Sequence, residues 1–232
     1  MEFPTTGLPA AANEAADSPA DPPADPPADC PLCPRLVAFH RANRMAFPTF
    51  FNAPVPSFGP TDGRLLIVGL APGLRGANQT GRPFTGDYAG DLLYSTLRDH
   101  GFSRGTYDRR ADDGLELVDC RITNAVRCVP PENKPVGAEV SACRPFLART
   151  IAGMPSLQVI LALGSLAHGA TLAALGQRKS AFKFGHCVVY ALPEGRTLVS
   201  SYHCSRYNTN TGKLTTEMFH SVFGTIRALL DG

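Results

Sequence analysis

Four of the seven cysteines have the number and spacing of a metal site. Cys30 and Cys33 form the pair CPLC, and Cys128 and Cys143 follow in the middle of the chain, 15 positions apart. A two-residue gap lets both sulfurs of the first pair reach one metal, and four thiolates complete either a zinc or an iron–sulfur site. Burial as small apolar residues is the alternative, because free cysteine is often part of a core. Spacing alone leaves both interpretations open.

The other three cysteines have different surroundings. Cys120 lies on the apolar face of an expected strand, Cys187 opens the apolar run CVVYAL, and Cys204 stands next to His203 in a polar segment. The first residues, MEFPTTGLPA, lack the basic and apolar regions of a secretion signal. Seven cysteines without such a signal favour a reducing compartment over a disulfide-bonded secreted protein.

Three polar segments, each after an apolar strand pattern, form a second candidate site. They are APGLRGANQTGRPFTGD after 64–70, the segment that begins at Asn124, and YHCSRYNTNTG after 196–201. Ligands of open parallel sheets bind outside the carboxyl ends of the strands. We therefore expect the three segments to meet in one crevice.

The first of these segments is rich in glycine, but it is not a nucleotide cradle. It contains neither G-x-G-x-x-G nor G-K-[ST], which excludes a dinucleotide or nucleoside-triphosphate site of those types. It offers tight turns, one aromatic ring at Phe84 and one carboxylate at Asp87. Core packing is the alternative for Phe84, and capping of the following helix is the alternative for Asp87.

The elements that must hold these segments alternate between strand and helix. Apolar runs predict strands at 64–70, 116–126, 157–163, 187–192 and 196–202. Helices are expected at 31–44, 88–101, 137–154, 165–175 and 213–230. This alternation predicts an α/β fold, a three-layer αβα sandwich around a mostly parallel sheet of about four strands.

One apolar stretch has the length of a membrane span. Residues 157–176 carry Gln158, Ser165 and His168 together with two internal glycines. A strand followed by a helix capped by Ser165 explains this composition better than a membrane-spanning helix.

The first 29 residues differ in composition from the rest. They contain six acids, no Lys or Arg, and the repetitive run ADPPADPPAD. Such a segment buries too little apolar surface to offset its ordering entropy, so we expect a disordered tail at 1–29 and one domain at 30–232. The whole chain has 22 basic and 20 acidic residues, whereas the domain has 22 and 14. This basic excess of 8 charges is compatible with a polyanionic partner.

Five motifs, in order and spacing, resemble those of the iron–sulfur uracil-DNA glycosylases. They are GLAPG, GRPFTGDYAG, ITNAVRC, ACRPFL and SYHCSRYNTNTGKLT, and the match covers roughly residues 30–230. The chain looks closest to the type 5 branch, in which an apolar residue, here Leu70, stands where the type 4 branch has Glu. The resemblance implies a monofunctional glycosylase that hydrolyses the N-glycosidic bond of uracil in DNA, for base excision repair. It also implies a pocket that accepts hypoxanthine, xanthine or modified uracils.

The resemblance implies a [4Fe–4S] cluster and identifies its ligands as Cys30, Cys33, Cys128 and Cys143. The cluster is regarded as structural in this family, so it would fasten the first helix and the loop 128–143 to the body of the domain. Three cations in and around that loop are then expected near DNA phosphates: Arg127, Lys134 and Arg144.

The same resemblance assigns a base pocket. A glycosylase must take its base out of the stack, because the reactive bond is inaccessible in a duplex. Gly69, Leu70 and Ala71 of the first motif are expected to line the pocket. Phe84 matches the ring that stacks on the base, and Asn124 matches the amide that reads the pyrimidine edge with a donor and an acceptor.

Two residues are expected to carry the chemistry. Cleavage builds positive charge on the sugar and negative charge on the leaving base, as in other glycoside chemistry. His203 matches a histidine that donates to the base oxygen. Asp87 matches the carboxylate assigned to type 5 enzymes, which orients water and balances the cation. Further roles follow for Asn208 with water or substrate, for Ser205 and Arg206 with phosphate, and for Tyr207 as a wedge in the vacated stack.

Two departures from the family pattern concern the geometry of the last loop and the preference among damaged bases. Cys204 stands where relatives have proline, which frees the backbone next to the histidine, and Tyr207 stands where Gln is more usual. Together with Leu70, Cys204 favours the alternative function, a non-catalytic iron–sulfur module that binds damaged DNA. Asp87 with His203 and Asn124 favours the enzyme. In either case the expected partner is DNA with deaminated bases, and we expect a monomer of the bacterial or archaeal cytoplasm that does not bind membranes.

Overall fold

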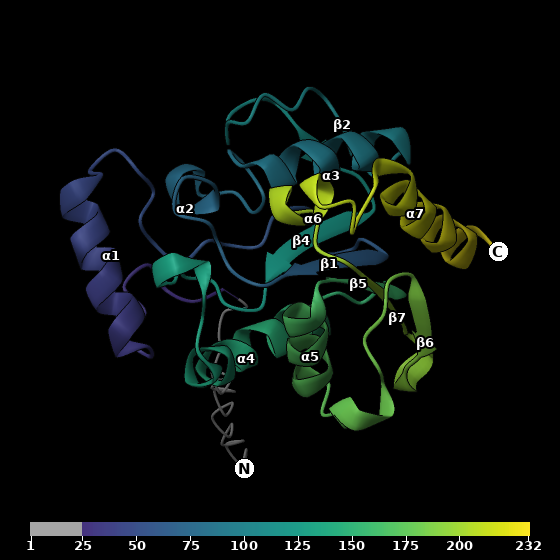
Figure 1. The fold of residues 1–232 in the computed structure, drawn as a ribbon. Coiled ribbons are helices and arrows are strands. Elements are labelled where there is room, and N and C mark those ends of the chain that lie inside the picture. The colour runs from purple at the N-terminus through teal and green to yellow at the C-terminus, as the bar shows by residue number, and fades with distance from the viewer. Residues whose placement is uncertain (1–24) are drawn as a thin grey trace, which may run out of the picture.

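The computed structural model describes residues 25–232, and a five-stranded sheet lies at the centre of this range (Figure 1). The strand order is β4 (Cys120–Asn124), β1 (Leu65–Gly69), β5 (Val159–Leu163), β7 (Thr197–Ser201) and β6 (Val188–Ala191). The first four are parallel, and β6 pairs antiparallel with β7 at the edge. The predicted mostly parallel sheet is confirmed, with one strand more than the expected four.

Helices cover both faces of this sheet, as the three-layer prediction requires. Helices α3 (Tyr88–Asp99) and α7 (Thr216–Asp231) pack on one face, and α4 (Gly137–Ala152) and α5 (Ser165–Ala174) pack on the other (Figure 1). Alternate residues of β1 belong to the two cores: Leu65 and Ile67 face the first pair of helices, and Leu66 and Val68 face the second. Because both faces are buried, the strands read as continuous apolar runs.

The remaining elements in the described range connect or flank these layers. They are α1 (Pro34–Ala46), α2 (Ala77–Thr80), β2 (Ser103–Arg104), β3 (Glu116–Leu117), α6 (Arg206–Asn210) and short 3-10 turns at Pro131–Asn133, Lys179–Ala181 and Pro193–Gly195.

Three predicted elements differ in detail. The strand predicted at 116–126 is two strands, β3 and β4, because Asp119 between them has a φ of 55° that breaks the extended chain. The last helix begins at Thr216, with the side chain of Thr215 accepting from the Met218 N–H. The capping role predicted for Ser165 is wrong, because Gly164 with a φ of 95° occupies the N-cap position and no side chain caps this helix.

The apolar stretch 157–176 forms β5 and α5, as predicted. Within residues 25–232, no helix combines the length and the apolar character that crossing a membrane requires.

The segment just before Cys30 is attached to the domain. The Asp25 carboxylate accepts hydrogen bonds from Arg127 at 2.5 Å and from Ser57 at 3.1 Å, and Asp29 pairs with Arg44 at 2.8 Å. Ordered contacts therefore begin five residues before the predicted boundary at residue 30. The disorder predicted for residues 1–24 lies outside the described range.

Arg127 overturns one prediction. Its side chain is 0% exposed and is held by Asp25, by Ser57 and by the hydroxyl of Thr150 at 2.8 Å. It therefore anchors the chain beside Cys128 and is not available to DNA phosphates.

Candidate functional site

The carboxyl ends of the parallel strands form the wall of one cleft. Loops after β1, β4 and β7 meet there, as their position at one edge of the sheet predicts. The cleft has a volume of about 880 Å³, which is in the range of ligand pockets. Its lining includes most of the predicted site residues: Leu70, Ala71, Phe84, Asp87, Asn124, His203, Ser205 and Arg206.

A glycine at the end of β1 lets two of these side chains meet. Gly69 pairs in register with Asn124 of β4. A methyl group on Gly69 would overlap the Asn124 side-chain oxygen and would lie 2.7 Å from the Phe84 ring. Because glycine has no Cβ, the amide and the ring can both pack against the strand end.

Phe84 and His203 form an aromatic wall. Their ring centroids are 5.9 Å apart with an interplanar angle of 27°. Phe84 has a φ of 55°, a left-handed backbone conformation that is rare for a bulky residue and is often found at functional sites. The residue is 7% exposed and is part of the core cluster, so it packs in the core and also lines the cleft.

Asp87 caps a helix and faces the cleft at the same time. Its Oδ1 accepts from the Gly90 N–H at 3.1 Å, so the capping interpretation is correct. Its other oxygen lies against the loop after β1, where a Cβ on Gly76 would be only 2.6 Å away. Burial raises the pKa of Asp87 above its ordinary value, and the N–H groups of Gly90 and Ala89 oppose this shift.

His203 is a neutral imidazole at physiological pH. Burial lowers its pKa to about 4, because a charged ring would lose the solvation that water provides. The Asn208 side chain donates to the His203 carbonyl oxygen at 2.8 Å and thereby holds the backbone beside the ring. Asn208 itself lies in an adjoining hollow, which shares Leu70 and His203 with the main cleft. Its predicted contact with water or substrate stays a prediction.

The segment after His203 begins with a buried residue. Cys204 is wholly buried in the core, and its thiol donates to the Ala89 carbonyl oxygen at 3.5 Å. This cysteine therefore fixes the loop against the start of α3, although the sequence places it in a polar segment.

Short helix α6 presents the expected DNA-contacting side chains. Ser205 caps α6 by accepting from the Asn208 N–H at 3.4 Å. The Arg206 guanidinium lies 5.4 Å from the centre of the Tyr88 ring, at the rim of the cleft. Tyr207 is 74% exposed, which leaves it free to contact a partner.

Sequence reasoning missed several residues that line the cleft. Tyr88 follows Asp87 within the motif GRPFTGDYAG, so its neighbours in the sequence were a usable signal. Arg109 comes from the loop 105–115, and its guanidinium pairs with Asp91 at 2.6 Å. Nothing in the sequence of that loop indicates that it reaches the cleft.

The four predicted metal ligands line a second cavity, away from the cleft. Cys30, Cys33, Cys128 and Cys143 surround it together with apolar side chains of α1 and α4, whereas the other three cysteines do not line it. Cys33 is the N-cap of α1, and the Arg127 N–H donates to the Cys143 sulfur at 3.4 Å.

The chemistry of this cavity fits a group bound by thiolates. N–H···S hydrogen bonds and helix N-termini both stabilise negative charge on sulfur. Burial and the neighbouring Cys143 raise the pKa of Cys33 to about 11, so thiolates here need a cation as a partner. Over residues 25–232, no group of three or more His, Cys, Asp or Glu side chains is arranged to hold a metal ion as it stands.

An ion pair joins α1, whose N-cap is Cys33, to α4, which contains Cys143. Arg35, two residues after Cys33, donates to both carboxylate oxygens of Glu139 at 2.7 and 2.8 Å. Glu139 lies one helical turn before Cys143 and is buried. The bidentate pair therefore sets the distance between α1 and α4 at the cavity.

Known proteins are similar in sequence to this chain over most of its length. A sequence model of the uracil DNA glycosylase superfamily matches residues 56–227. The type-5 uracil-DNA glycosylase of Thermus thermophilus is 46% identical over 198 residues, which cover 83% of this chain and 90% of that protein. The type-5 uracil-DNA glycosylase of Pyrobaculum aerophilum is 39% identical over 197 residues, covering 83% and 85%. The type-4 uracil-DNA glycosylase of Sulfurisphaera tokodaii is 31% identical over 175 residues, 72% of each chain.

Proposed function

The chain belongs to the uracil-DNA glycosylase superfamily and to its type 5 branch, and we propose that it removes uracil from DNA by hydrolysis in the cleft at the carboxyl edge of its sheet. The observation that carries this assignment is the convergence of Phe84, Asp87, Asn124 and His203 from three separate loops on one cleft.

The base pocket uses Phe84 and Asn124. A base flipped out of the stack loses its neighbours, and the Phe84 ring replaces one of them with an aromatic face. Asn124 is 3% exposed, so its amide reads the base edge where water competes little. An amide offers one acceptor and two donor hydrogens, which matches the alternating groups on the edge of uracil.

His203 stabilises the leaving base. When the N-glycosidic bond breaks, the electron pair goes to the base, and negative charge gathers on its oxygens. A pKa of about 4 keeps the imidazole uncharged, and the neutral ring donates one N–H to such an oxygen. It keeps that proton, because a neutral imidazole is a very weak acid. The Asn208 bond to the His203 backbone keeps the ring in place while this charge develops.

Asp87 balances the charge on the sugar. The ring oxygen and anomeric carbon become positive as the base leaves, and a carboxylate in a buried environment attracts this cation more strongly than one in water. The same carboxylate accepts a proton from the water that attacks the anomeric carbon. Leu70 cannot take this role, because it has no polar group. The products are a free base and an abasic site.

The cavity of cysteines is the proposed site of a [4Fe–4S] cluster. Four thiols surround it, two from the segment that leads into α1, one from α4 and one from the segment after β4. The Arg127 N–H donates to the sulfur of Cys143. When bound, the cluster supplies a structural link between these elements. A purified protein that is brown and absorbs in the visible would support this proposal, whereas a colourless protein that contains zinc would contradict it.

DNA is proposed to lie across the rim of the cleft. Arg206 and Ser205 are placed for phosphate contacts, and the exposed Tyr207 is placed to fill the space that the flipped base leaves. The basic excess of the domain supports the same partner. We further propose that the protein acts as a monomer in the cytoplasm, where DNA of bacteria and archaea is repaired.

The apolar wall at Leu70 supports a broad range of bases. An apolar side chain makes no demand on the hydrogen-bonding pattern of the base, so hypoxanthine, xanthine and modified uracils become substrates besides uracil. The alternative, a module that binds damaged DNA without cleaving it, rests on Leu70 and Cys204. The buried position of Cys204 weakens this alternative, because the cysteine packs in the core and does not line the cleft.

Cleavage of a labelled duplex tests the assignment. A duplex with one central uracil is incubated with the protein and then heated in alkali, beside an undamaged duplex and one with hypoxanthine. A cut at uracil that needs alkali supports a monofunctional glycosylase, and a cut at hypoxanthine supports the broad pocket. Binding without any cut would favour the damage-binding module.

A further inference from the structure

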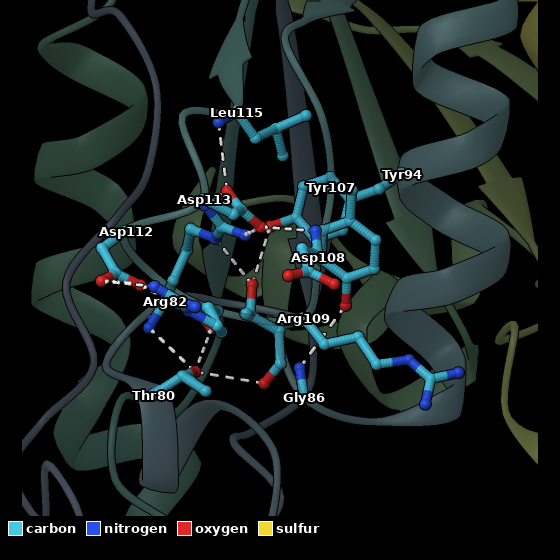
Figure 2. A network of polar contacts seen from close by, with 12 residues as sticks. Thr80, Arg82, Gly86, Tyr94, Tyr107, Asp108, Arg109, Asp112, Asp113 and Leu115 are labelled. Carbon is cyan, nitrogen blue, oxygen red and sulfur yellow. Dashed lines mark hydrogen bonds and ion pairs between the residues drawn. The ribbon is translucent and has the colours of Figure 1, made fainter.

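The loop 105–115 contacts the segment that carries Phe84 through Tyr107 and Asp113, which do not line the cleft. Figure 2 shows this network, in which side chains of the loop and of α3 surround Arg82 and reach the backbone of the next residues. Arg82 and Asp113 form a bidentate ion pair with N···O distances of 2.8 and 2.7 Å. Their side chains are 4% and 1% exposed, so solvent does not weaken the pair.

The loop holds its own carboxylate in position. The Asp113 oxygens also accept from the Asp108 N–H at 2.8 Å and from the Leu115 N–H at 3.1 Å (Figure 2). Three aromatic rings, those of Phe58, Tyr94 and Tyr107, lie 5.2 to 5.8 Å from the Arg82 guanidinium. The cation is thus fixed by a carboxylate on one side and by rings on the others.

Two tyrosine hydroxyls form hydrogen bonds with the backbone around Phe84. Tyr94 donates to the Pro83 carbonyl oxygen at 2.6 Å, and Tyr107 donates to the Phe84 carbonyl oxygen at 3.3 Å. The Tyr107 hydroxyl also accepts from the Gly86 N–H at 3.4 Å. The backbone on both sides of Phe84 is therefore bonded to side chains of α3 and of the loop.

These hydrogen bonds hold a stretch of backbone whose conformation is energetically unfavourable. A φ of 55° is unfavourable for phenylalanine, and such a conformation persists only where the surroundings hold it. If the segment relaxed, the ring would swing away from Gly69 and from His203, and the base pocket would lose its aromatic wall.

We propose that Arg82, Tyr94, Tyr107 and Asp113 are positioning residues of the glycosylase, which hold Phe84 in its left-handed conformation so that its ring forms the base pocket. The inference rests on the proposed function for its activity readout. It assigns a role to the loop 105–115, which reaches the substrate cleft at Arg109 and supports it at Asp113.

Tyr107→Phe is the sharpest test. It removes both hydroxyl contacts and keeps the ring, which packs 4.5 Å from Tyr94. The matched control is Tyr190→Phe, which removes a hydroxyl that donates to the Lys183 carbonyl oxygen at 2.8 Å, away from the cleft. We expect single-turnover cleavage by Tyr107→Phe to fall about 3- to 10-fold, the factor that one hydrogen bond contributes, and cleavage by the control to stay unchanged.

A double-mutant cycle separates positioning from general destabilisation. If Tyr107 acts through the Phe84 ring, then Tyr107→Phe changes the rate less than twofold in a Phe84→Ala background. If it only weakens the fold, the two effects multiply. Equal rates for Tyr107→Phe and the wild type, or multiplying effects, would overturn the proposal.

Binding gives a second readout that does not depend on turnover. A duplex with one 2′-fluorinated deoxyuridine resists cleavage, because fluorine destabilises the sugar cation. We expect Tyr107→Phe to lose part of the preference for this duplex over an undamaged one, and Tyr190→Phe to keep it. If the wild-type protein prefers the fluorinated duplex but does not cleave a duplex with unmodified deoxyuridine, the proposed glycosylase function is refuted. The effect of Tyr107→Phe on the binding preference would still decide whether Tyr107 is a positioning residue.

Discussion

Replacement of Asp87 by asparagine separates catalysis from stability at one position. The substitution keeps the size of the side chain and an oxygen that can accept from the Gly90 N–H, and asparagine caps helices about as well as aspartate. It removes the negative charge that we assign to the sugar cation and the base that accepts a proton from water. Losses of this kind are about 10²- to 10⁴-fold in rate, or roughly 2.7 to 5.4 kcal/mol of transition-state stabilisation.

Asp87→Asn is expected to lower the rate of cleavage but not the stability of the fold. Burial raises the pKa of Asp87 above 3.8, so its charged form is less stable in the fold than in the unfolded chain. The favourable contribution of this group is present below pH 3.8 and is lost as pH rises through the folded pKa. Near pH 7.5, Asp87→Asn is therefore expected to unfold at the same temperature as the wild type or at a higher one, and this advantage should disappear in acid.

The assay is single-turnover cleavage of a uracil duplex, with thermal unfolding of the same samples. Asp99→Asn is the control, since it removes a carboxylate at the other end of α3, where Asp99 is exposed and pairs with Arg98. The control should match the wild type in rate. A rate for Asp87→Asn within threefold of the wild type would refute the charge assignment, and a large drop in its unfolding temperature would refute the argument from burial.

Three further predictions concern the pocket, the histidine and the cysteine cavity. Gly69→Ala should lower single-turnover cleavage at least about 100-fold, because its methyl group displaces the base-reading side chains, whereas Gly224→Ala on an open face of α7 should cleave normally. The pKa of His203 near 4 predicts that its protonation does not affect the rate between pH 6 and 8; a midpoint near 6.5 that disappears in His203→Gln would contradict this. Cys143→Ser should lose visible absorption and unfold at a lower temperature, whereas Cys187→Ser should keep its colour, and equal spectra for the two variants would argue against the cluster.

Local patterns in the sequence predict the layers of this fold well. The apolar runs at 64–70 and 157–163 are strands of the sheet, and the helices at 88–101 and 137–154 lie where the periodicity places them. Strand ends follow from the same patterns, and the ends of parallel strands must lie at one edge. That Asn124, Phe84 and His203 lie in one cleft was therefore predictable from the sequence.

It was harder to predict that a single residue would both support the fold and line the cleft. Phe84 and Asp87 each had a structural interpretation and a functional one. The structure confirms the structural interpretation of each residue and also places both in the lining of the cleft: the ring packs in the core, and the carboxylate caps α3. A sequence offers these interpretations as alternatives, because residue type does not say how many neighbours a side chain has.

What the sequence by itself determined is the order of the elements, the motifs and the edge of the sheet at which they meet, because hydrophobic periodicity and turn residues act over a few positions. Only the tertiary structure decided which cations are internal and so are not available to a partner. Arg127 is buried through Asp25, which lies 102 positions away, and Arg82 is held by Asp113, 31 positions away. Such pairs form because the topology of the sheet brings distant loops together. Burial, which follows from the same topology, lowers the pKa of His203. The local pattern of residues indicates neither these long-range ion pairs nor the burial of the side chains.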